Sequence, residues 1–285
     1  MSTDFLAVMA AASRARVREA IAVRPRAAVE RAALASPAPP PLVLSAQGFD
    51  IIAECKLRSP AVGALRVGAA DDVAVRVQSY AAAGAAAVSV LTEPSRFDGS
   101  LQHLVQASGA LAAARVPAMR KDFLVDPYQL YEARLAGAGG VLLILRMLPR
   151  SGIAALMDAA AALGLFVLLE AFDEADIDLA GGMVAGGRTG AGHAPVLVGL
   201  NCRDLVTLQV VPGRLEALAP RLPAQLPRVA ESGLDTAGDV ARVAAAGYEL
   251  ALVGSALMKQ AAPGALLAGM LAAGRAARSG RPSHG

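Results

Sequence analysis

The chain of 285 residues contains no tryptophan and only two cysteines, Cys55 and Cys202. Two cysteines provide neither a disulfide framework nor the ligand spacing of a zinc site, so we expect a reducing, cytoplasmic environment and no metal. Long hydrophobic runs are also missing, because charged residues such as Asp158 interrupt the apolar stretches. No stretch reaches the length of a membrane span, and no basic residues precede the first apolar ones. We therefore expect neither membrane association nor a signal peptide.

Lysine is scarce: only Lys56, Lys121 and Lys259 occur among 27 basic residues. Arginine and lysine are nearly interchangeable on a solvated surface, so this imbalance indicates a compositional bias of the whole chain. The net charge is only +3 and the arginines are scattered, which argues against binding to nucleic acid. Positions that keep lysine against this bias, and the single asparagine Asn201, are candidates for specific chemistry.

Apolar residues make up 55% of the chain and charged residues 18%, which excludes a disordered protein. One pattern recurs: an alanine-rich helical segment, a glycine and a short apolar strand. The glycines are Gly84, Gly137, Gly164 and Gly247. Glycine is the expected residue just past the end of a helix. Their spacings are close to multiples of about 27 residues, the length of one strand–helix unit in a parallel sheet.

Eight apolar runs predict strands, at 51–56, 87–91, 117–121, 140–145, 166–170, 196–201, 228–231 and 250–254. Eight strands buried on both faces and separated by helices predict an α/β fold, a single-domain (β/α)8 TIM barrel over 47–275. An open, doubly wound sheet is the alternative, but the glycine-rich first turn typical of that fold is absent.

We also predict the structure of three regions outside the strands. Residues 1–46 form an N-terminal helical extension packed on the barrel, with one helix over 5–34 ended by the proline-rich segment 36–41. The glycine-rich segment 183–194 is expected to form a loop on the face opposite the active site. Residues 276–285 are expected to be a flexible tail.

In such a barrel the chemistry lies at the carboxyl ends of the strands. Polar side chains end five of the predicted strands, and they are Glu54, Lys56, Lys121, Glu170, Asn201, Arg203 and Glu231. Alternation along a strand places Glu54 and Lys56 on the same side, facing the mouth of the barrel, and points Arg120 away from it. One charge at a strand end is common, because strands end in solvent. Several charges ending apolar runs at one mouth indicate a site, because burial without partners is costly.

Two further pairs follow strands seven and eight, Ser232-Gly233 and Gly254-Ser255. At this place in the barrel, a short loop and a helix start present backbone N–H groups and a hydroxyl. The two pairs together predict a phosphate site.

Seven segments resemble one family and occur in its order: IIAECKLRSP, VSVLTEPSRFDGSLQHL, VPAMRKDFLVDPYQLYEARLAGAGGVLLIL, VLLEAFDE, GLNCRDL, AESGLDT and LVGSALMK. The family is indole-3-glycerol-phosphate synthase, a carboxy-lyase of tryptophan biosynthesis. The resemblance implies a phosphosugar substrate, 1-(2-carboxyphenylamino)-1-deoxyribulose 5-phosphate. It also implies ring closure with loss of carbon dioxide and water, and no cofactor.

The resemblance implies a role for each candidate residue. Lys121 is the acid that protonates the attacked carbonyl oxygen, since an ammonium donates a proton and arginine effectively does not. Glu170 is the base of the dehydration, Lys56 a second acid or the holder of the departing carboxylate, and Glu54 the group that orients the lysines. Which lysine serves which step stays open.

Other residues are expected to hold the substrate. Asn201, Arg203 and Glu231 orient it, Ser59 contacts it, and Phe97, Phe123 and Leu252 form an apolar wall against the anthranilate ring. Ser232, Gly233, Gly254 and Ser255 hold the phosphate. The loop at Ala61-Val62-Gly63 departs from the Ser-Lys-Gly of many relatives, which puts contacts from this loop in question.

Three alternatives remain. The first is the sister phosphoribosyl-anthranilate isomerase or another phosphosugar-handling barrel. The isomerase would need a cysteine base at the end of the first strand, where Glu54 and Lys56 face the mouth instead. An inactive relative that acts as a binding partner would not need the full set of acids and bases. A paralogue could supply indole units to a secondary product. The sequence assigns no role to Lys259, and both a monomer and a complex with other tryptophan-pathway enzymes stay open.

Overall fold

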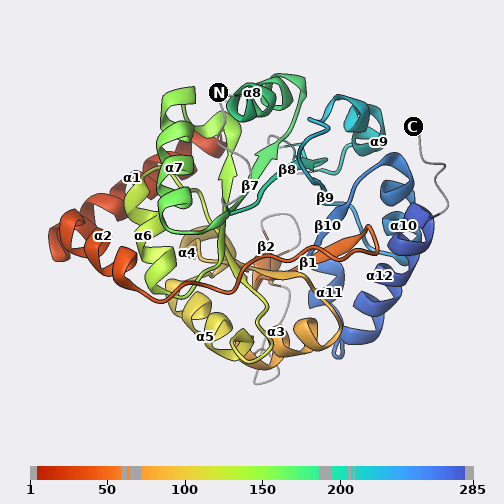
Figure 1. The fold of residues 1–285 in the computed structure, drawn as a ribbon, viewed down its shortest axis with the longest axis horizontal. Helices are drawn as coiled ribbons and strands as arrows, with labels where there is room; N and C mark the ends of the chain where they lie inside the picture. Colours follow the sequence, from red (N-terminus) through yellow and green to blue (C-terminus); the bar gives the residue numbers. More distant parts are fainter. Residues whose placement is uncertain are drawn as a thin grey trace.

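The structure, a computed structural model, describes residues 5–59, 63–64, 72–185, 194–204, 207 and 209–279. Eight parallel strands close into a barrel in the order β1-β10-β9-β8-β7-β6-β5-β4 (Figure 1). The strands are β1 (Asp50–Cys55), β4 (Ala87–Leu91), β5 (Ala118–Lys121), β6 (Gly140–Ile144), β7 (Phe166–Ala171), β8 (Val196–Asn201), β9 (Arg228–Glu231) and β10 (Leu250–Val253). The predicted barrel is confirmed, and pairing of β1 with β4 rules out the open sheet.

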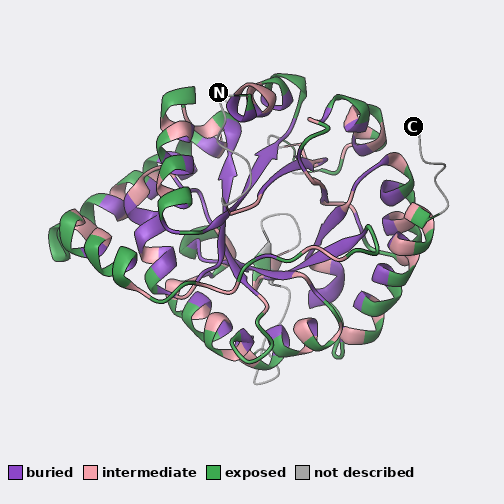
Figure 2. Cartoon of the chain, viewed as in Figure 1, coloured by how far each residue is buried: buried purple, intermediate pink, exposed green. Residues whose placement is uncertain are grey.

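Helices surround the barrel on all sides (Figure 1). They are α1 (Phe5–Val23), α2 (Arg26–Ala35), α3 (Val73–Ala82), α4 (Pro94–Phe97), α5 (Leu101–Leu111), α6 (Pro127–Leu135), α7 (Arg150–Ala162), α8 (Glu174–Val184), α9 (Arg214–Leu218), α10 (Ala237–Ala246), α11 (Ser255–Met258) and α12 (Gly264–Ser279), with 3-10 turns η2 (Leu145–Met147) and η3 (Ala219–Arg221). Figure 2 shows the strands buried and the helices exposed mainly on their outer sides. Burial therefore follows the layered pattern expected of the fold.

The sequence located each barrel strand to within one residue at either end. The four predicted helix-ending glycines all have positive φ, with Gly247 at 112° as the cap of α10. Glycine adopts this left-handed conformation at no steric cost, which is why it marks the turn from helix to strand. One element was not predicted: β2 (Arg58–Ser59) and β3 (Gly63–Ala64) pair antiparallel after β1.

The N-terminal extension differs from its prediction. It contains two helices, α1 and α2, rather than one helix over 5–34. The break falls at Pro25, which has no N–H to continue the hydrogen bonds of α1 and instead precedes the first turn of α2. The helical part ends at Ser36, where the proline-rich segment begins, as predicted.

The structure corrects the prediction for the C-terminal tail and describes only part of the glycine-rich segment 183–194. Helix α12 continues to Ser279, so the first four residues of the predicted tail are helical, and 280–285 lie outside the description. Of the glycine-rich segment 183–194, Met183 and Val184 end α8, and 186–193 lie outside the described residues.

Helix α1 packs across the carboxyl ends of β4 and β5. Its Arg16 guanidinium lies 2.7 Å from Asp122 Oδ1 and 3.4 Å from Glu93 Oε1, and those two carboxylate side chains are 1% and 0% exposed. Ser13 Oγ donates a hydrogen bond to the Phe123 carbonyl oxygen at 2.5 Å. These bonds fix the helix beside the segment after Lys121.

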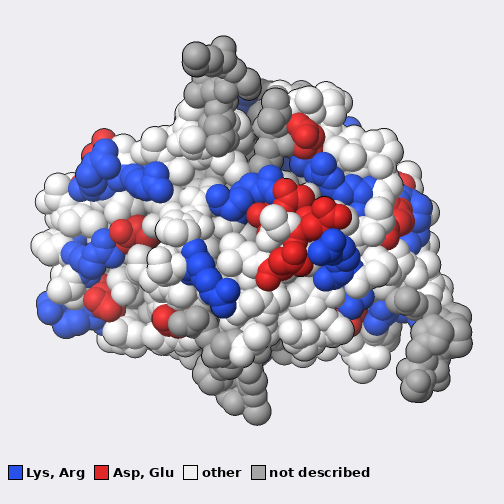
Figure 3. All heavy atoms as spheres, turned by 90° about the horizontal axis from the view of Figure 1, so that it is seen from above, with Lys and Arg blue, Asp and Glu red and all other residues white. Residues whose placement is uncertain are grey.

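Arginines on the surface lie among acidic side chains. Figure 3 shows one side of the molecule on which Lys and Arg alternate with Asp and Glu rather than forming a field of one sign. Arg221, for example, lies 3.6 Å from Glu174 and 3.3 Å from Asp178. Among the described residues, no helix combines the length and apolar character needed to cross a membrane.

Replacing Arg16 with methionine tests how α1 is held. The variant keeps the apolar stem but leaves the carboxylates of Glu93 and Asp122 without this cation, so we expect a loss of about 1–3 kcal/mol in the free energy of unfolding. Urea denaturation measures it. Arg31→Met, at an exposed position on α2, is the matched control and should be near neutral. Equal midpoints for the two variants would contradict this assignment.

Candidate functional site

A cavity of about 240 Å³ opens at the carboxyl ends of the barrel strands. It is lined by all but one of the residues predicted for the site, namely Glu54, Lys56, Phe97, Lys121, Phe123, Glu170, Asn201, Arg203, Glu231, Ser232, Gly233, Leu252, Gly254 and Ser255. The exception, Ser59, lies in β2, and its side chain is outside the described part of the structure. The loop positions Ala61 and Val62 are also outside it. The predicted strand ends therefore do converge.

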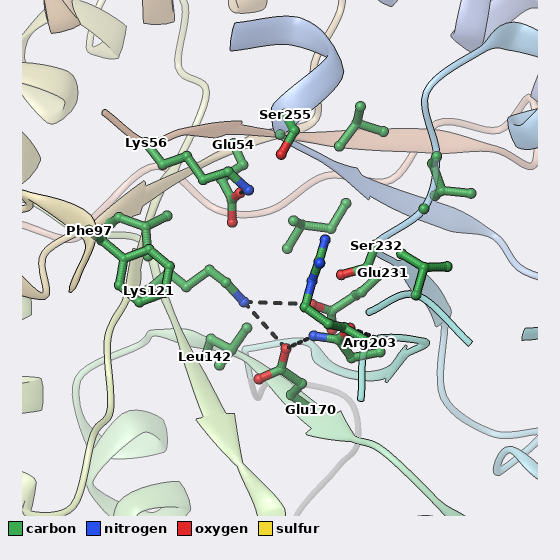
Figure 4. A pocket seen from close by; sticks show the side chains of 18 of the residues that line it. Glu54, Lys56, Phe97, Lys121, Leu142, Glu170, Arg203, Glu231, Ser232 and Ser255 are labelled. Atoms are coloured by element: carbon green, nitrogen blue, oxygen red, sulfur yellow. Dashed lines mark hydrogen bonds and ion pairs between the residues drawn. The ribbon is translucent and has the colours of Figure 1, made fainter. Parts of the chain in front are cut away.

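The ammonium of Lys121 lies at the centre of this cavity (Figure 4). Its Nζ is 3.4 Å from Glu170 Oε1 and 3.6 Å from Glu231 Oε2. Burial alone would lower the pKa of Lys121, but the charges of Glu170, Glu231 and Glu54 outweigh it and raise the pKa. Lys121 is therefore an ammonium in the free protein and can act as a proton donor.

A second ion pair occupies the end of β1. Lys56 Nζ lies 2.5 Å from Glu54 Oε1. Burial raises the pKa of Glu54, but the charges of Lys56 and Lys121 dominate and hold it below its usual value. A Cβ on Gly254 would lie 2.2 Å from Glu54 Oε1 and 3.0 Å from Lys56 Nζ. Gly254 thus leaves the space that this ion pair fills.

The single asparagine holds two parts of the site together. Asn201 Nδ2 donates to Glu170 Oε1 at 2.8 Å, and its Oδ1 accepts from the backbone N–H of Arg203 at 2.9 Å. One amide thereby orients the carboxylate of Glu170 and the start of the segment carrying Arg203. Aspartate could accept the second bond but could not donate the first.

Glu231 is a buried carboxyl group of the cavity that lacks hydrogen-bond donors among the described residues. Both of its carboxyl oxygens are buried, and no described residue donates a hydrogen bond to them. Burial and the neighbouring Glu170 carboxylate raise the pKa of Glu231 well above its usual range, although Lys121 acts in the opposite direction. A Cβ on Gly199 would lie 2.0 Å from Glu231 Oε1, so this glycine of β8 leaves room for the carboxyl group. Sequence reasoning missed Gly199.

The segments after β9 and β10 have backbone geometry suited to an anion. Ser232 and Gly233 both have positive φ, 70° and 65°. Serine in this conformation costs about 1–3 kcal/mol, a strain typical of functional segments. Ser255 begins the short helix α11, beside Gly254 and the Lys56 ammonium. Both predicted phosphate-binding pairs therefore line the cavity together with Lys56.

Aromatic rings form the apolar side of the cavity. The rings of Phe97 and Phe123 lie 6.3 Å apart, and Phe5 packs edge-on against Phe123 at 5.8 Å. Phe5 and Leu6 of α1 both line the cavity, so the N-terminal extension contributes to the site. Its sequence carried no signal of this, because the contact depends on how α1 packs.

Lys259, to which the sequence assigned no role, also lines the cavity. It caps the end of α11 and is exposed, so it lies at the rim. All three lysines of the chain thus line one cavity, which their scarcity could have indicated.

Residues predicted to point away from the mouth do so. The Arg120 guanidinium is buried behind the barrel, donating to the Gln129 carbonyl oxygen at 2.8 Å and pairing with Asp122 at 3.2 Å. Cys55 and Cys202 are buried in the apolar core. Alternation along the strands therefore separates the core from the site.

Comparisons with known proteins agree with this geometry. A family model described as indole-3-glycerol phosphate synthase matches residues 8–268. Enzymes of that name from Mycobacterium leprae (strain TN) and Mycobacterium avium are 40% and 39% identical, over 86% and 85% of both chains. Among solved structures, a 3-hexulose-6-phosphate synthase from Salmonella typhimurium has a TM-score of 0.57 at 12% identity, over 79% of this chain and 98% of that one. The last likeness concerns the fold alone.

Replacing Gly199 with alanine tests the position of the Glu231 carboxyl. The new Cβ displaces that group, so we expect kcat to fall on the order of 10–100-fold and stability by about 1–3 kcal/mol. Steady-state kinetics and urea unfolding measure the two effects. Gly109→Ala in α5, where nothing lies within 4 Å of the new Cβ, is the matched control and should leave kcat unchanged. Normal turnover by Gly199→Ala would refute the packing argument.

Proposed function

Because the chain belongs to the indole-3-glycerol phosphate synthase family, we propose that it converts 1-(2-carboxyphenylamino)-1-deoxyribulose 5-phosphate to indole-3-glycerol phosphate. The reaction closes the indole ring with loss of carbon dioxide and water. The observation that carries the proposal is the Lys121 ammonium between Glu170 and Glu231 at the barrel mouth. A cation there is suited to neutralise the charge that develops on the attacked carbonyl oxygen.

In this proposal Lys121 is the acid of the ring closure. The ring carbon attacks the ribulose carbonyl, and Lys121 donates a proton to the oxygen. Glu170 is the base that removes a proton during dehydration, with its carboxylate oriented by Asn201. Lys56, held by Glu54, serves as the second acid or holds the carboxylate that leaves.

The remaining residues bind the substrate. Ser232, Gly233, Gly254 and Ser255 hold the phosphate, and Phe97, Phe123 and Leu252 stack against the anthranilate ring. Arg203 and Glu231 orient the chain between these ends, and Ser59 contacts it from the segment after β1. The proposed compartment is the cytoplasm, in keeping with a chain that has only two cysteines.

The sister isomerase reaction fits the geometry less well. That reaction needs a cysteine base at the end of the first strand. Cys55 is buried in the core, whereas Glu54 and Lys56 line the cavity.

Purified protein supplied with the carboxyphenylamino-deoxyribulose phosphate should form a fluorescent indole product without added metal. Lys121→Arg keeps the positive charge but does not release a proton near neutral pH, so we expect turnover to fall on the order of 100- to 10,000-fold. Circular dichroism and thermal unfolding check that the variant folds. A folded Lys121→Arg enzyme with a near-normal rate would exclude the acid role. A wild-type protein that binds the substrate without turnover would favour a binding partner over an enzyme.

Lys259 at the rim offers a test of the phosphate position. Removing one exposed cation weakens attraction for an anionic substrate, so Lys259→Gln should raise KM about 2–5-fold and reduce the dependence of kcat/KM on ionic strength. Arg115→Gln makes the same charge change in the exposed turn before β5, at the opposite end of the barrel, and should change neither. The same KM for both variants would exclude a role for Lys259.

A further inference from the structure

The proposed reaction consumes a proton. The substrate carboxylate leaves as neutral carbon dioxide, and its bonding electron pair restores the aromatic ring. The carbonyl oxygen takes one proton when the ring closes and a second when it leaves as water. One proton returns from the adjacent carbon to the base. Each turnover therefore needs one proton more than the substrate supplies, a requirement that rests on the proposed function.

The charges around Lys121 show where such a proton can be held. The Glu54 carboxylate already has its own cation, Lys56, at 2.5 Å. Lys121 is left between two carboxyl groups, those of Glu170 and Glu231, whose side chains are 3% and 1% exposed. Two buried carboxylates that share one cation leave one negative charge without a partner. Such a charge is costly in free energy when it is shielded from water.

Hydrogen bonding distinguishes the two carboxyl groups. Glu170 Oε1 accepts hydrogen bonds from Asn201 Nδ2 at 2.8 Å and from Lys121 Nζ at 3.4 Å. These two donors stabilise the ionised form of Glu170. Glu231 has no such donor among the described residues, since Lys121 Nζ stays 3.6 Å away. The neighbouring Glu170 carboxylate raises the pKa of Glu231. A proton on Glu231 removes the repulsion between these two buried groups.

We propose that Glu231 is protonated in the free protein and that it reprotonates the neutral amine of Lys121 during turnover. The charged or polar groups that line the cavity with it include Glu54 from β1, Lys121 from β5, Glu170 from β7, and Asn201 and Arg203 at the end of β8. Among the carboxyl groups in this set, Glu231 lacks a strong donor, so it is the one that keeps the proton. It acts through Lys121 and does not need to touch the reacting atoms.

The proton transfers balance. After Lys121 has protonated the carbonyl oxygen, its neutral amine takes the proton of Glu231: one O–H bond breaks and one N–H bond forms. Lys121 then protonates the departing hydroxyl. Glu170, which has taken the proton from carbon, returns it to the Glu231 carboxylate, and solvent supplies one proton to Lys121. An amine is a much stronger base than a carboxylate, so the proton transfer from Glu231 to the neutral Lys121 amine is favourable in free energy.

The resting state can be tested without turnover. Infrared spectra of the free wild-type protein at neutral pH should contain the C=O stretching band of a protonated, buried carboxyl group. Glu231→Gln should remove this band. Glu54→Gln is the matched control, because it removes a buried carboxyl group that is ionised, and the band should persist. A wild-type spectrum without the band, or a band that persists in Glu231→Gln, would overturn the inference.

Kinetics test the delivery step. Glutamine matches the size and neutrality of protonated Glu231 but cannot give up a proton, so Glu231→Gln should bind substrate with KM within about threefold and lose kcat on the order of 100-fold. Because the protonated form is the active one, wild-type kcat should fall as pH rises through the raised pKa of Glu231. This alkaline limb should be absent in Glu231→Gln.

The outcomes separate the two proposals. Near-normal kcat in Glu231→Gln at all pH values would show that neutrality suffices and would overturn proton delivery. A protein that shows the infrared band but forms no indole product would refute the proposed function and, with it, the delivery step. Product formation without the band would refute the proton on Glu231 alone.

Discussion

The rest of the site depends on one buried ammonium. Lys121 ends β5 inside a ring of carboxyl groups from β1, β7 and β9, and its charge is what allows these groups to be buried there. Removing one partner of such a buried set typically costs about 3–5 kcal/mol, because the remaining charges lose compensation. The barrel mouth is therefore built for charge balance, and the same balance keeps a transferable proton on Lys121.

Two glycines make this arrangement sterically feasible. Gly254 and Gly199 each stand where a side chain would lie within about 2 Å of a carboxyl oxygen, of Glu54 and Glu231 respectively. Small residues inside the barrel thus create the volume that the long glutamate side chains fill. The electrostatics of the site therefore depend on the packing of the barrel interior, because Glu54 and Glu231 each fill space that a nearby glycine leaves open.

Much of the fold and site could be predicted because both depend on local patterns. Apolar runs and helix-ending glycines locate the strands, and the polar residue at each strand end then falls at the mouth by topology alone. Phe5 and Leu6 could not be found in this way, since their contact with the cavity arises from how α1 packs on β4 and β5. Nor does spacing reveal Gly199, because its role appears only when Glu231 lies beside it.

The chain keeps lysine at positions 56 and 121 of the site although it is rich in arginine. A planar guanidinium would satisfy the carboxylates as ion-pair partners at least as well as an ammonium does. It would hold its proton too tightly to serve as an acid. Electrostatic balance alone therefore does not explain why this arginine-rich chain keeps lysine at positions 56 and 121. The proposed proton transfer explains it for Lys121, because only an ammonium both pairs with the buried glutamates and can give up its proton when a substrate oxygen becomes basic.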